Sequence, residues 1–280
     1  MKIVFTHKCL EYSQAGHPES VARVKSSADL LCGQYEFVEP TAAGEETIGL
    51  VHPPEHLSRV KSRSFVDWDT PAYDGIYDYA RLSVGAAVEA AELALGGDPA
   101  FSLMRPPGHH AGRDSVSGFC YFNNIAIAAR KALQDVERVA IIDFDCHHGN
   151  GTQSIFLGDR RVLYVSLHQS PLYPGTGLTQ KENCLNYPVP AGTGENEYME
   201  VFRSALTDLI QFNPAMIAVS AGFDAFKDDP ITDMGLDTST FEKIGEEIRK
   251  LGRPTFSVLE GGYADRLGEC IAAYLKGLES

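Results

Sequence analysis

The stretch R-V-A-I-I-D-F-D-C-H-H-G-N-G-T, residues Arg138 to Thr152, indicates how the chain folds and where its chemistry lies. It begins as an apolar, partly β-branched run, which is typical of a buried parallel strand. Side chains alternate between the two faces of a strand, so Asp145 and His147 share one side if the strand extends that far. A carboxylate and an imidazole that converge beside a glycine-rich loop make half of a metal site. An isolated D-x-H pattern is equally consistent with a strand that ends in solvated polar residues.

Length and composition restrict the classes to which the chain can belong. It has 280 residues, 44% hydrophobic and 22% charged, which is ordinary for a globular protein with a sizeable core. The formal net charge of −14 argues against a general affinity for nucleic acid or for an anionic membrane surface. The six cysteines include no C-x-x-C pair, so neither a disulfide framework nor a zinc ribbon is expected. The first residues enter a strand pattern directly and no apolar run is long enough to span a membrane, which favours a cytoplasmic protein.

Short apolar runs alternate with amphipathic helical patterns along most of the chain. This alternation predicts βα units and a mainly parallel sheet, and a further short apolar run lies at Thr47–Val51. No repeat, low-complexity tract or linker marks a boundary, so residues 1–280 are expected to form a single α/β domain. The clearest candidate strands are Lys2–Thr6, Ala100–Met104, Val139–Ile142, Val162–Val165, Ala215–Val219 and Thr255–Leu259.

Reactive side chains follow five of these strands. In parallel α/β sheets, ligands bind in the crevice beyond the carboxyl ends of the strands. Any one such group could be incidental, but five together predict Asp, His and Tyr side chains around one cleft. The groups are His109 and His110, the run Asp143–His148, Ser166 with His168, Asp224, and Tyr263.

Three of these side chains can form a catalytic metal site. Asp145, His147 and Asp224 supply two carboxylate oxygens and one imidazole nitrogen. Three protein ligands leave a coordination position for water or substrate, which distinguishes catalytic from structural zinc sites. No second full ligand set is evident, so a dinuclear site is not favoured. Cys146 lies between two of the ligands, and strand alternation points it into the packing instead.

The remaining groups suit proton transfer and charge stabilisation. An isolated His pair is usually a loop feature, but His109 and His110 beside a metal could act as proton-transfer groups. Asp143 and Asn150 are the nearest candidates in sequence to tune their basicity. Tyr263, which follows two glycines, can donate its hydroxyl to a developing oxyanion. Together with metal-activated water these groups amount to machinery for amide hydrolysis.

These motifs resemble those of the zinc-dependent histone deacetylases and their bacterial homologues, in the arginase/deacetylase superfamily. R-P-P-G-H-H, G-F-C-Y-F-N-N, D-F-D-C-H-H-G-N-G-T, L-Y-P-G-T-G, S-A-G-F-D and E-G-G-Y occur in the family's order. H-P-E at His17–Glu19, Asn150 and the A-G-F-D motif resemble the class II branch. The resemblance implies one eight-stranded, mainly parallel sheet flanked by helices. It also implies removal of an acetyl or other acyl group from a lysine side chain or a related amine.

The resemblance assigns roles to individual residues. It implies one zinc ion on Asp145, His147 and Asp224, with His110 as general base and acid. His109, paired with Asp143, would hold the proton network on the oxyanion side, and Tyr263 would stabilise the oxyanion. Asn150 stands where class I enzymes have an Asp, which leaves the basicity of His110 open. A structural potassium ion is also implied, on main-chain oxygens of Asp143, His147 and Leu167 and the side chains of Asp145 and Ser166.

The resemblance also implies a substrate tunnel. Phe119 and Tyr173 would wall a passage for an aliphatic, lysine-like stem, although two aromatic residues of a core would look the same in sequence. Asp69, in D-W-D-T-P-A-Y-D, matches the rim Asp that binds the substrate backbone in the family. Gly118 and Gly262 complete the expected substrate-binding positions, together with the residue discussed next.

Ile231 bears on the choice of substrate. Polyamine deacetylases of the class II branch have an acidic residue at the matching position, whereas Ile231 is apolar. Asp228 and Asp229 are close by in sequence and are expected to face away. The pattern therefore favours an acylated lysine peptide, or a small acylated amine, over acetylspermidine.

Three alternatives remain open from the sequence. An acetylpolyamine deacetylase is the first. A ureohydrolase of the same fold would need two bridged manganese ions and more Asp ligands than these loops offer. A silent acyl-lysine binding module should have lost a metal ligand or the tyrosine, and all are present here. The oligomeric state is not given by the sequence, and a homo-oligomer is one option.

Overall fold

The computed structural model describes residues 1–280, and it contains one sheet in which every strand pair is parallel. The strands are β1 (Lys2–Val4), β2 (Glu36–Val38), β3 (Ala100–Ser102), β4 (Val139–Asp143), β5 (Val162–Gln169), β6 (Cys184–Val189), β7 (Met216–Ala221) and β8 (Thr255–Leu259). Their order across the sheet is β2-β1-β3-β8-β7-β4-β5-β6. The predicted α/β fold with an eight-stranded parallel sheet is confirmed.

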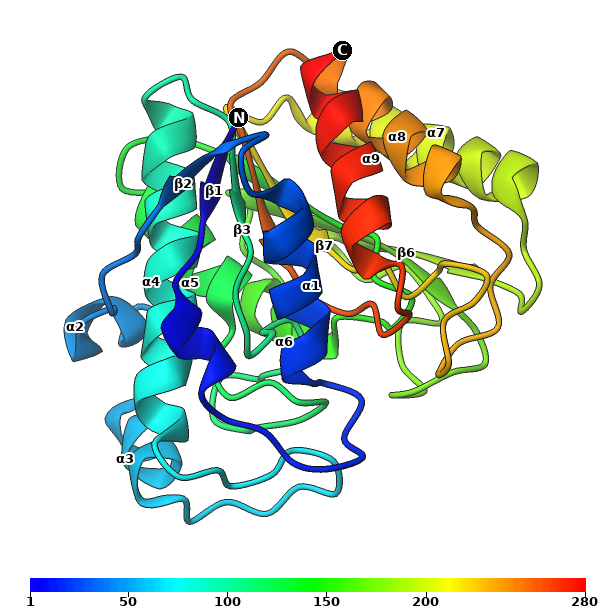
Figure 1. Cartoon of the computed structure of the whole chain (residues 1–280). Coiled ribbons are helices and arrows are strands. Elements are labelled where there is room, and N and C mark those ends of the chain that lie inside the picture. Colours follow the sequence, from blue (N-terminus) through cyan, green and yellow to red (C-terminus); the bar gives the residue numbers. More distant parts are fainter.

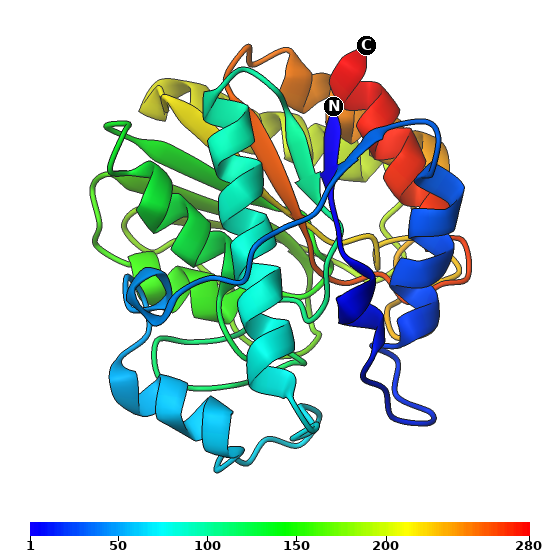
Figure 2. The ribbon, with the colours of Figure 1, turned by 60° about the vertical axis from the view of Figure 1, so that its left-hand side comes forward.

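Helices cover both faces of this sheet (Figures 1 and 2). One face carries α4 (Ile76–Leu95), α5 (Asn124–Ala132) and α6 (Asn150–Phe156). The other carries α1 (Val21–Leu31), α7 (Glu195–Phe212), α8 (Thr238–Arg249) and α9 (Leu267–Glu279). The short helices α2 (Glu45–Ile48) and α3 (Pro54–Ser62) lie outside these layers, α3 near the start of α4 (Figure 1), and a 3₁₀ turn, η1 (His7–Leu10), follows β1.

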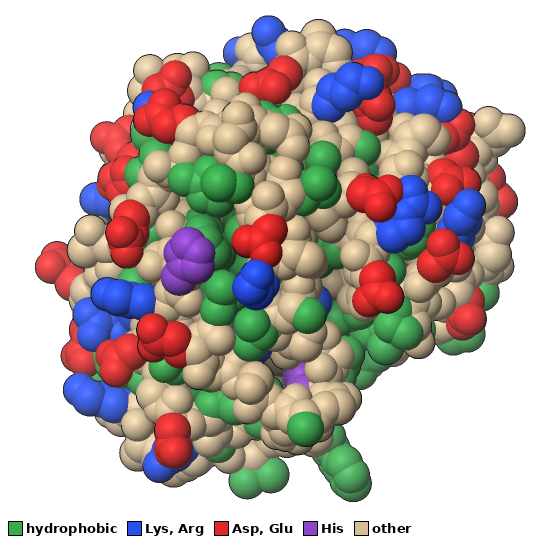
Figure 3. Space-filling model, in the orientation of Figure 1, with side chains coloured by type: hydrophobic (Ala, Val, Ile, Leu, Met, Phe, Trp, Pro, Cys, Tyr) green, Lys and Arg blue, Asp and Glu red, His purple; other side chains and the backbone are tan.

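Burial on both faces explains the composition of the central strands. Every residue of β3, β4, β5, β7 and β8 is buried. Strands covered on both sides read as almost continuous apolar runs rather than alternating ones. The outer surface is different, since acidic and basic side chains are interspersed over the face in Figure 3. No helix is long and apolar enough to cross a membrane.

The structure differs from the sequence prediction at the periphery. The apolar run Thr47–Val51 belongs to helix α2 and the turn after it, because Gly44 and two glutamates begin a helix there. Strands β2 and β6 were not predicted. They are the two edge strands, and β6 contains Pro188, which is tolerated only where one side of a strand is unpaired.

Candidate active site and metal centre

The candidate site lies at the carboxyl ends of five strands that are neighbours in the sheet. These strands are β3, β8, β7, β4 and β5. Reactive groups follow the first four, whereas Ser166 and His168 lie within β5, which extends beyond the predicted Val165 to Gln169. Parallel strands end at the same edge, so residues more than a hundred positions apart meet there. The structure therefore brings the predicted groups together in one place.

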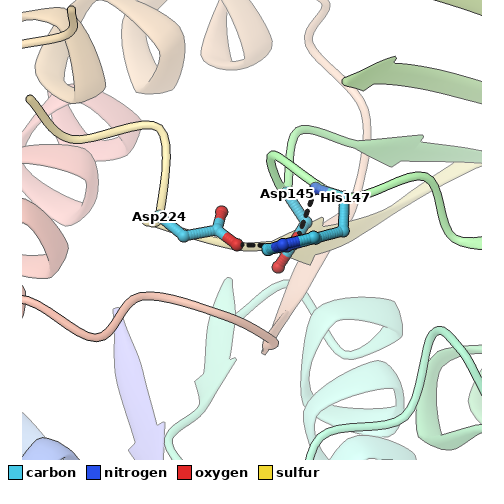
Figure 4. A group of neighbouring side chains, drawn as sticks. All are labelled: Asp145, His147 and Asp224. Atoms are coloured by element: carbon cyan, nitrogen blue, oxygen red, sulfur yellow. Dashed lines mark hydrogen bonds and ion pairs between the residues drawn. The ribbon is translucent and has the colours of Figure 1, made fainter. Parts of the chain in front are cut away.

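Asp145, His147 and Asp224 form a compact buried cluster (Figure 4). His147 Nδ1 lies 2.7 Å from Asp224 Oδ2 and 3.2 Å from Asp145 Oδ1. The potential ligand atoms of all three residues lie within 4.8 Å of one another. Two carboxylates and one imidazole in this arrangement can hold a divalent metal ion and leave one position open.

The cluster is built by a turn and not by strand alternation. Strand β4 ends at Asp143, so the alternation expected to align Asp145 with His147 does not reach them. Instead, Asp145 Oδ1 accepts the backbone N–H of His147 at 2.9 Å, and Asp224 Oδ1 accepts that of Cys146 at 2.7 Å. The loops after β4 and β7 are thereby tied together. The side chain of Cys146 is buried in the core, as predicted.

The electrostatics of the cluster favour a bound cation. Burial and the neighbouring Asp145 raise the pKa of Asp224 to about 7. Burial disfavours a charged imidazole, but Asp224 and Asp145 outweigh it and raise the pKa of His147 to about 10. A Cβ atom at Gly261 would lie 2.6 Å from one carboxylate oxygen of Asp145 and 2.6 Å from one of Asp224. Any residue larger than glycine would therefore displace these two oxygens. The donor set and its tight cradle fit a divalent metal ion.

Two histidines line the space beside the cluster. His109 Nδ1 lies 3.1 Å from Asp143 Oδ2, which also accepts the hydroxyl of Tyr164 at 2.8 Å. His110 Nδ1 lies 2.8 Å from Asn150 Oδ1. The structure therefore pairs each histidine with the partner that the sequence suggested.

The two imidazoles differ in their protonation. Burial opposes charge on His109, but Asp145 and Asp143 raise its pKa to about 10. Burial lowers the pKa of His110, and the positive charges of His109 and His147 lower it further. His110 is therefore the imidazole that is free to accept a proton near neutral pH.

A pocket of about 240 Å³ leads to this cluster. Phe119 lies beside Tyr263, with 5.9 Å between ring centroids, and Tyr173 lies beside His110 at 5.2 Å. Aromatic rings thus stand on two sides of the passage. Of the other predicted substrate-binding residues, Gly262 lies outside the pocket lining, and those that line it are Asp69, Gly118 and Ile231.

The residues predicted for a potassium ion include Asp145 and His147 of the cluster and its neighbours on β4 and β5. Ser166 is paired with Asp143 in the register of β4 and β5, and Leu167 follows it. Ser166 Oγ lies 2.9 Å from His168 Nδ1, so His168 supports this strand end.

Sequence reasoning missed a buried network of charged side chains. Glu260 Oε2 accepts the backbone N–H groups of Gly108 at 2.7 Å and of His109 at 3.1 Å, which fixes the histidine loop to β8. Arg23 Nε donates to the carbonyl of Gly262 at 2.5 Å, and its guanidinium lies 4.6 Å from the centre of the Tyr263 ring. The motifs E-G-G-Y and H-P-E contain Glu260 and Glu19 of this network, but the partners of these residues are far apart from them in sequence.

The same network joins Glu19 to two arginines. Glu19 Oε1 accepts from Arg23 at 3.2 Å and from Arg105 Nε at 2.7 Å, and all three side chains are buried. A buried carboxylate between two guanidinium groups is satisfied in charge and in hydrogen bonds. It connects α1 to the R-P-P-G-H-H loop.

Asp228 and Asp229, which were expected to face away from the substrate, are both absent from the pocket lining. Asp229 is nevertheless buried, and its Oδ2 accepts the backbone N–H of Tyr263 at 2.7 Å. The adjacent Asp228 is exposed, as expected.

Comparison with known proteins identifies the family. The family model of the histone deacetylase domain matches residues 17–278. The chain belongs to this family. A probable deacetylase of Methanothermobacter thermautotrophicus is 41% identical, over 95% of this chain and 85% of its own. Acetylpolyamine amidohydrolase 2 of Pseudomonas aeruginosa is 36% identical, over 96% of this chain and 83% of its own.

A solved structure agrees with this assignment over the whole length. The acetylpolyamine aminohydrolase of Burkholderia pseudomallei superposes with a TM-score of 0.94 at 28% identity, covering 100% of this deacetylase and 99% of that chain. The chain is thus a hydrolase of the deacetylase family, with the fold of its solved relatives.

Proposed function

We propose that this deacetylase uses one zinc ion to hydrolyse the acyl amide of a lysine side chain or of a related amine. The observation that carries the proposal is the buried cluster of Asp145, His147 and Asp224 at the base of a pocket that also holds His110 and Tyr263. Zinc at these ligands would polarise the amide carbonyl and make water more acidic. All other steps fall to side chains of the chain itself.

His110 is the proton carrier of the proposed reaction. Its lowered pKa keeps the imidazole neutral, so its free nitrogen accepts a proton from the attacking water. The same nitrogen then returns that proton to the leaving amine. Asn150, at 2.8 Å from His110 Nδ1, accepts the hydrogen on that nitrogen and leaves Nε2 as the base.

Tyr263 and His109 provide electrostatic stabilisation of the reacting groups. The Tyr263 hydroxyl donates to the oxyanion that forms on the substrate carbonyl. Burial raises the pKa of this phenol, so it stays protonated and able to donate. His109, held by Asp143 and raised in pKa to about 10, provides a fixed positive charge beside the reacting groups.

The pocket sets the class of substrate. Phe119 and Tyr173 give the passage aromatic walls, which suit the methylene stem of a lysine or of a small diamine. Asp69 at the lining can accept a hydrogen bond from the substrate backbone. We also assign the structural potassium ion to the end of β4 and β5, on the five residues named from the sequence, where Asp143 and Ser166 are paired.

Two substrate types compete for this pocket. Ile231 lines it and offers no carboxylate to a distant ammonium group, which favours a peptide with an acylated lysine. The names of two relatives, both acetylpolyamine hydrolases, favour an acetylated polyamine instead.

A substrate panel with and without chelator tests both points. Acetyl-lysine peptide, acetylspermidine and acetylputrescine are compared by acetate release, and we expect the peptide to have the highest kcat/KM. A tenfold preference for an acetylpolyamine, equivalent to about 1.4 kcal/mol, would refute the argument from Ile231. Turnover that persists in chelator would refute the metal-dependent reaction itself.

A further inference from the structure

We propose that Asp229 is a positioning residue that sets the place of the Tyr263 hydroxyl through the tyrosine backbone. The inference deepens the proposed function and rests on it, because it assigns a cause to the position of the oxyanion donor. Asp229 is not itself one of the residues that line the pocket or form the metal cluster.

The carboxylate of Asp229 joins two loops that carry pocket residues. Its Oδ2 accepts the backbone N–H of Tyr263 at 2.7 Å, and its Oδ1 accepts that of Ile231 at 3.1 Å. The first belongs to the loop after β8 and the second to the loop after β7. Hydrogen bonds to an ionised acceptor are stronger than those between neutral groups. One buried side chain thus fixes the loop that carries the oxyanion donor relative to the loop that carries Ile231.

The backbone at Tyr263 needs such a clamp. The two residues before it are glycines, and Gly262 has φ of 116°, in a region that only glycine adopts readily. Arg23 holds the carbonyl of Gly262 at 2.5 Å and lies over the tyrosine ring. Asp229 accepts the N–H of Tyr263, so both the carbonyl and the N–H of the peptide group between Gly262 and Tyr263 are hydrogen-bonded. Displacing a positioned group by about 1 Å can cost a hundredfold in rate.

The neighbouring aspartate provides a matched control. Asp229→Asn has nearly the same shape but only one accepting oxygen, so one of the two N–H groups loses its partner whichever way the amide turns. Asp228→Asn makes the same chemical change on the adjacent exposed side chain, for which the structure shows no hydrogen bond. We expect Asp229→Asn to lower kcat at least tenfold with KM within threefold, and Asp228→Asn to leave both within twofold.

A double-mutant cycle with Tyr263→Phe separates positioning from general damage. If Asp229 acts through the tyrosine hydroxyl, Asp229→Asn changes kcat by less than twofold once that hydroxyl is gone. Equal fold-losses in both backgrounds would overturn the proposal. If Asp229→Asn does not fold, Asp229→Glu keeps the charge, moves both oxygens by one methylene, and enters the same cycle.

Amide hydrogen exchange gives a readout that does not depend on activity. Asp229→Asn should accelerate exchange of the Tyr263 N–H relative to the parent and to Asp228→Asn. Unchanged exchange in every Asp229 variant would show that the clamp is absent and overturn the inference alone. A parent that lacks deacetylase activity, or that tolerates Tyr263→Phe, would instead refute the proposed function and the role of Asp229 with it.

Discussion

Replacing Gly261 by alanine tests whether the Asp145 and Asp224 carboxylates are held as strictly in position as a metal site requires. The added Cβ would lie 2.6 Å from Asp145 Oδ2 and 2.6 Å from Asp224 Oδ2. Carbon and oxygen atoms that are not bonded stay about 3.5 Å apart, so each carboxylate would have to retreat by roughly 0.9 Å. Metal–ligand distances tolerate only about 0.2 Å. We therefore expect Gly261→Ala to weaken zinc binding about 100-fold.

The assay is competition for zinc against a chromogenic chelator of known affinity, with thermal unfolding measured on the same samples. Gly44→Ala is the control, because a Cβ at that exposed glycine would meet no atom within 4 Å. It should bind zinc as the parent does. If folded Gly261→Ala held zinc within threefold of the parent, the geometric reasoning would be refuted.

The other predictions concern catalysis and pH. Tyr263→Phe should keep the fold and the zinc and lose on the order of a hundredfold or more in kcat, since an oxyanion donor is removed; a fewfold loss would exclude the assigned role. Asn150→Asp should raise the pKa of His110, because a carboxylate favours imidazolium, and so move the acid limb of the kcat/KM profile to higher pH; an unmoved limb would contradict this. Burial lowers the pKa of His52 to about 3. The contribution of neutral His52 to the free energy of unfolding is therefore complete above about pH 6.5 and is lost as pH falls toward 3. Chemical denaturation at pH 5 and 7 should show that His52 contributes about 2 kcal/mol to this loss, and a His52→Gln variant with the parent's pH slope would count against it.

The central strands could be predicted because strands buried on both faces have almost continuous apolar sequences. Runs such as Val139–Ile142 are apolar without interruption, and reactive residues stand where they end. The edge strands β2 and β6 escaped prediction because one side of each is unpaired and their residues are more mixed.

The cluster could be predicted for a different reason from the one that builds it. Residue type and spacing pointed to Asp145 and His147, although strand alternation ends at Asp143 and hydrogen bonds in the turn complete the arrangement. The role of Asp229 could not be read from K-D-D-P, which looks like an exposed turn. Its partner Tyr263 is 34 positions away and reaches it only because β7 and β8 are neighbours.

A zinc titration of metal-free enzyme, with bound metal and acetate release measured on the same samples, tests the single metal site most directly. Activity should rise with zinc and reach its maximum at one equivalent per chain. Asp224→Ala should gain neither metal nor activity. Full activity without metal, or a requirement for two equivalents, would contradict the single three-ligand site on which the proposed reaction depends.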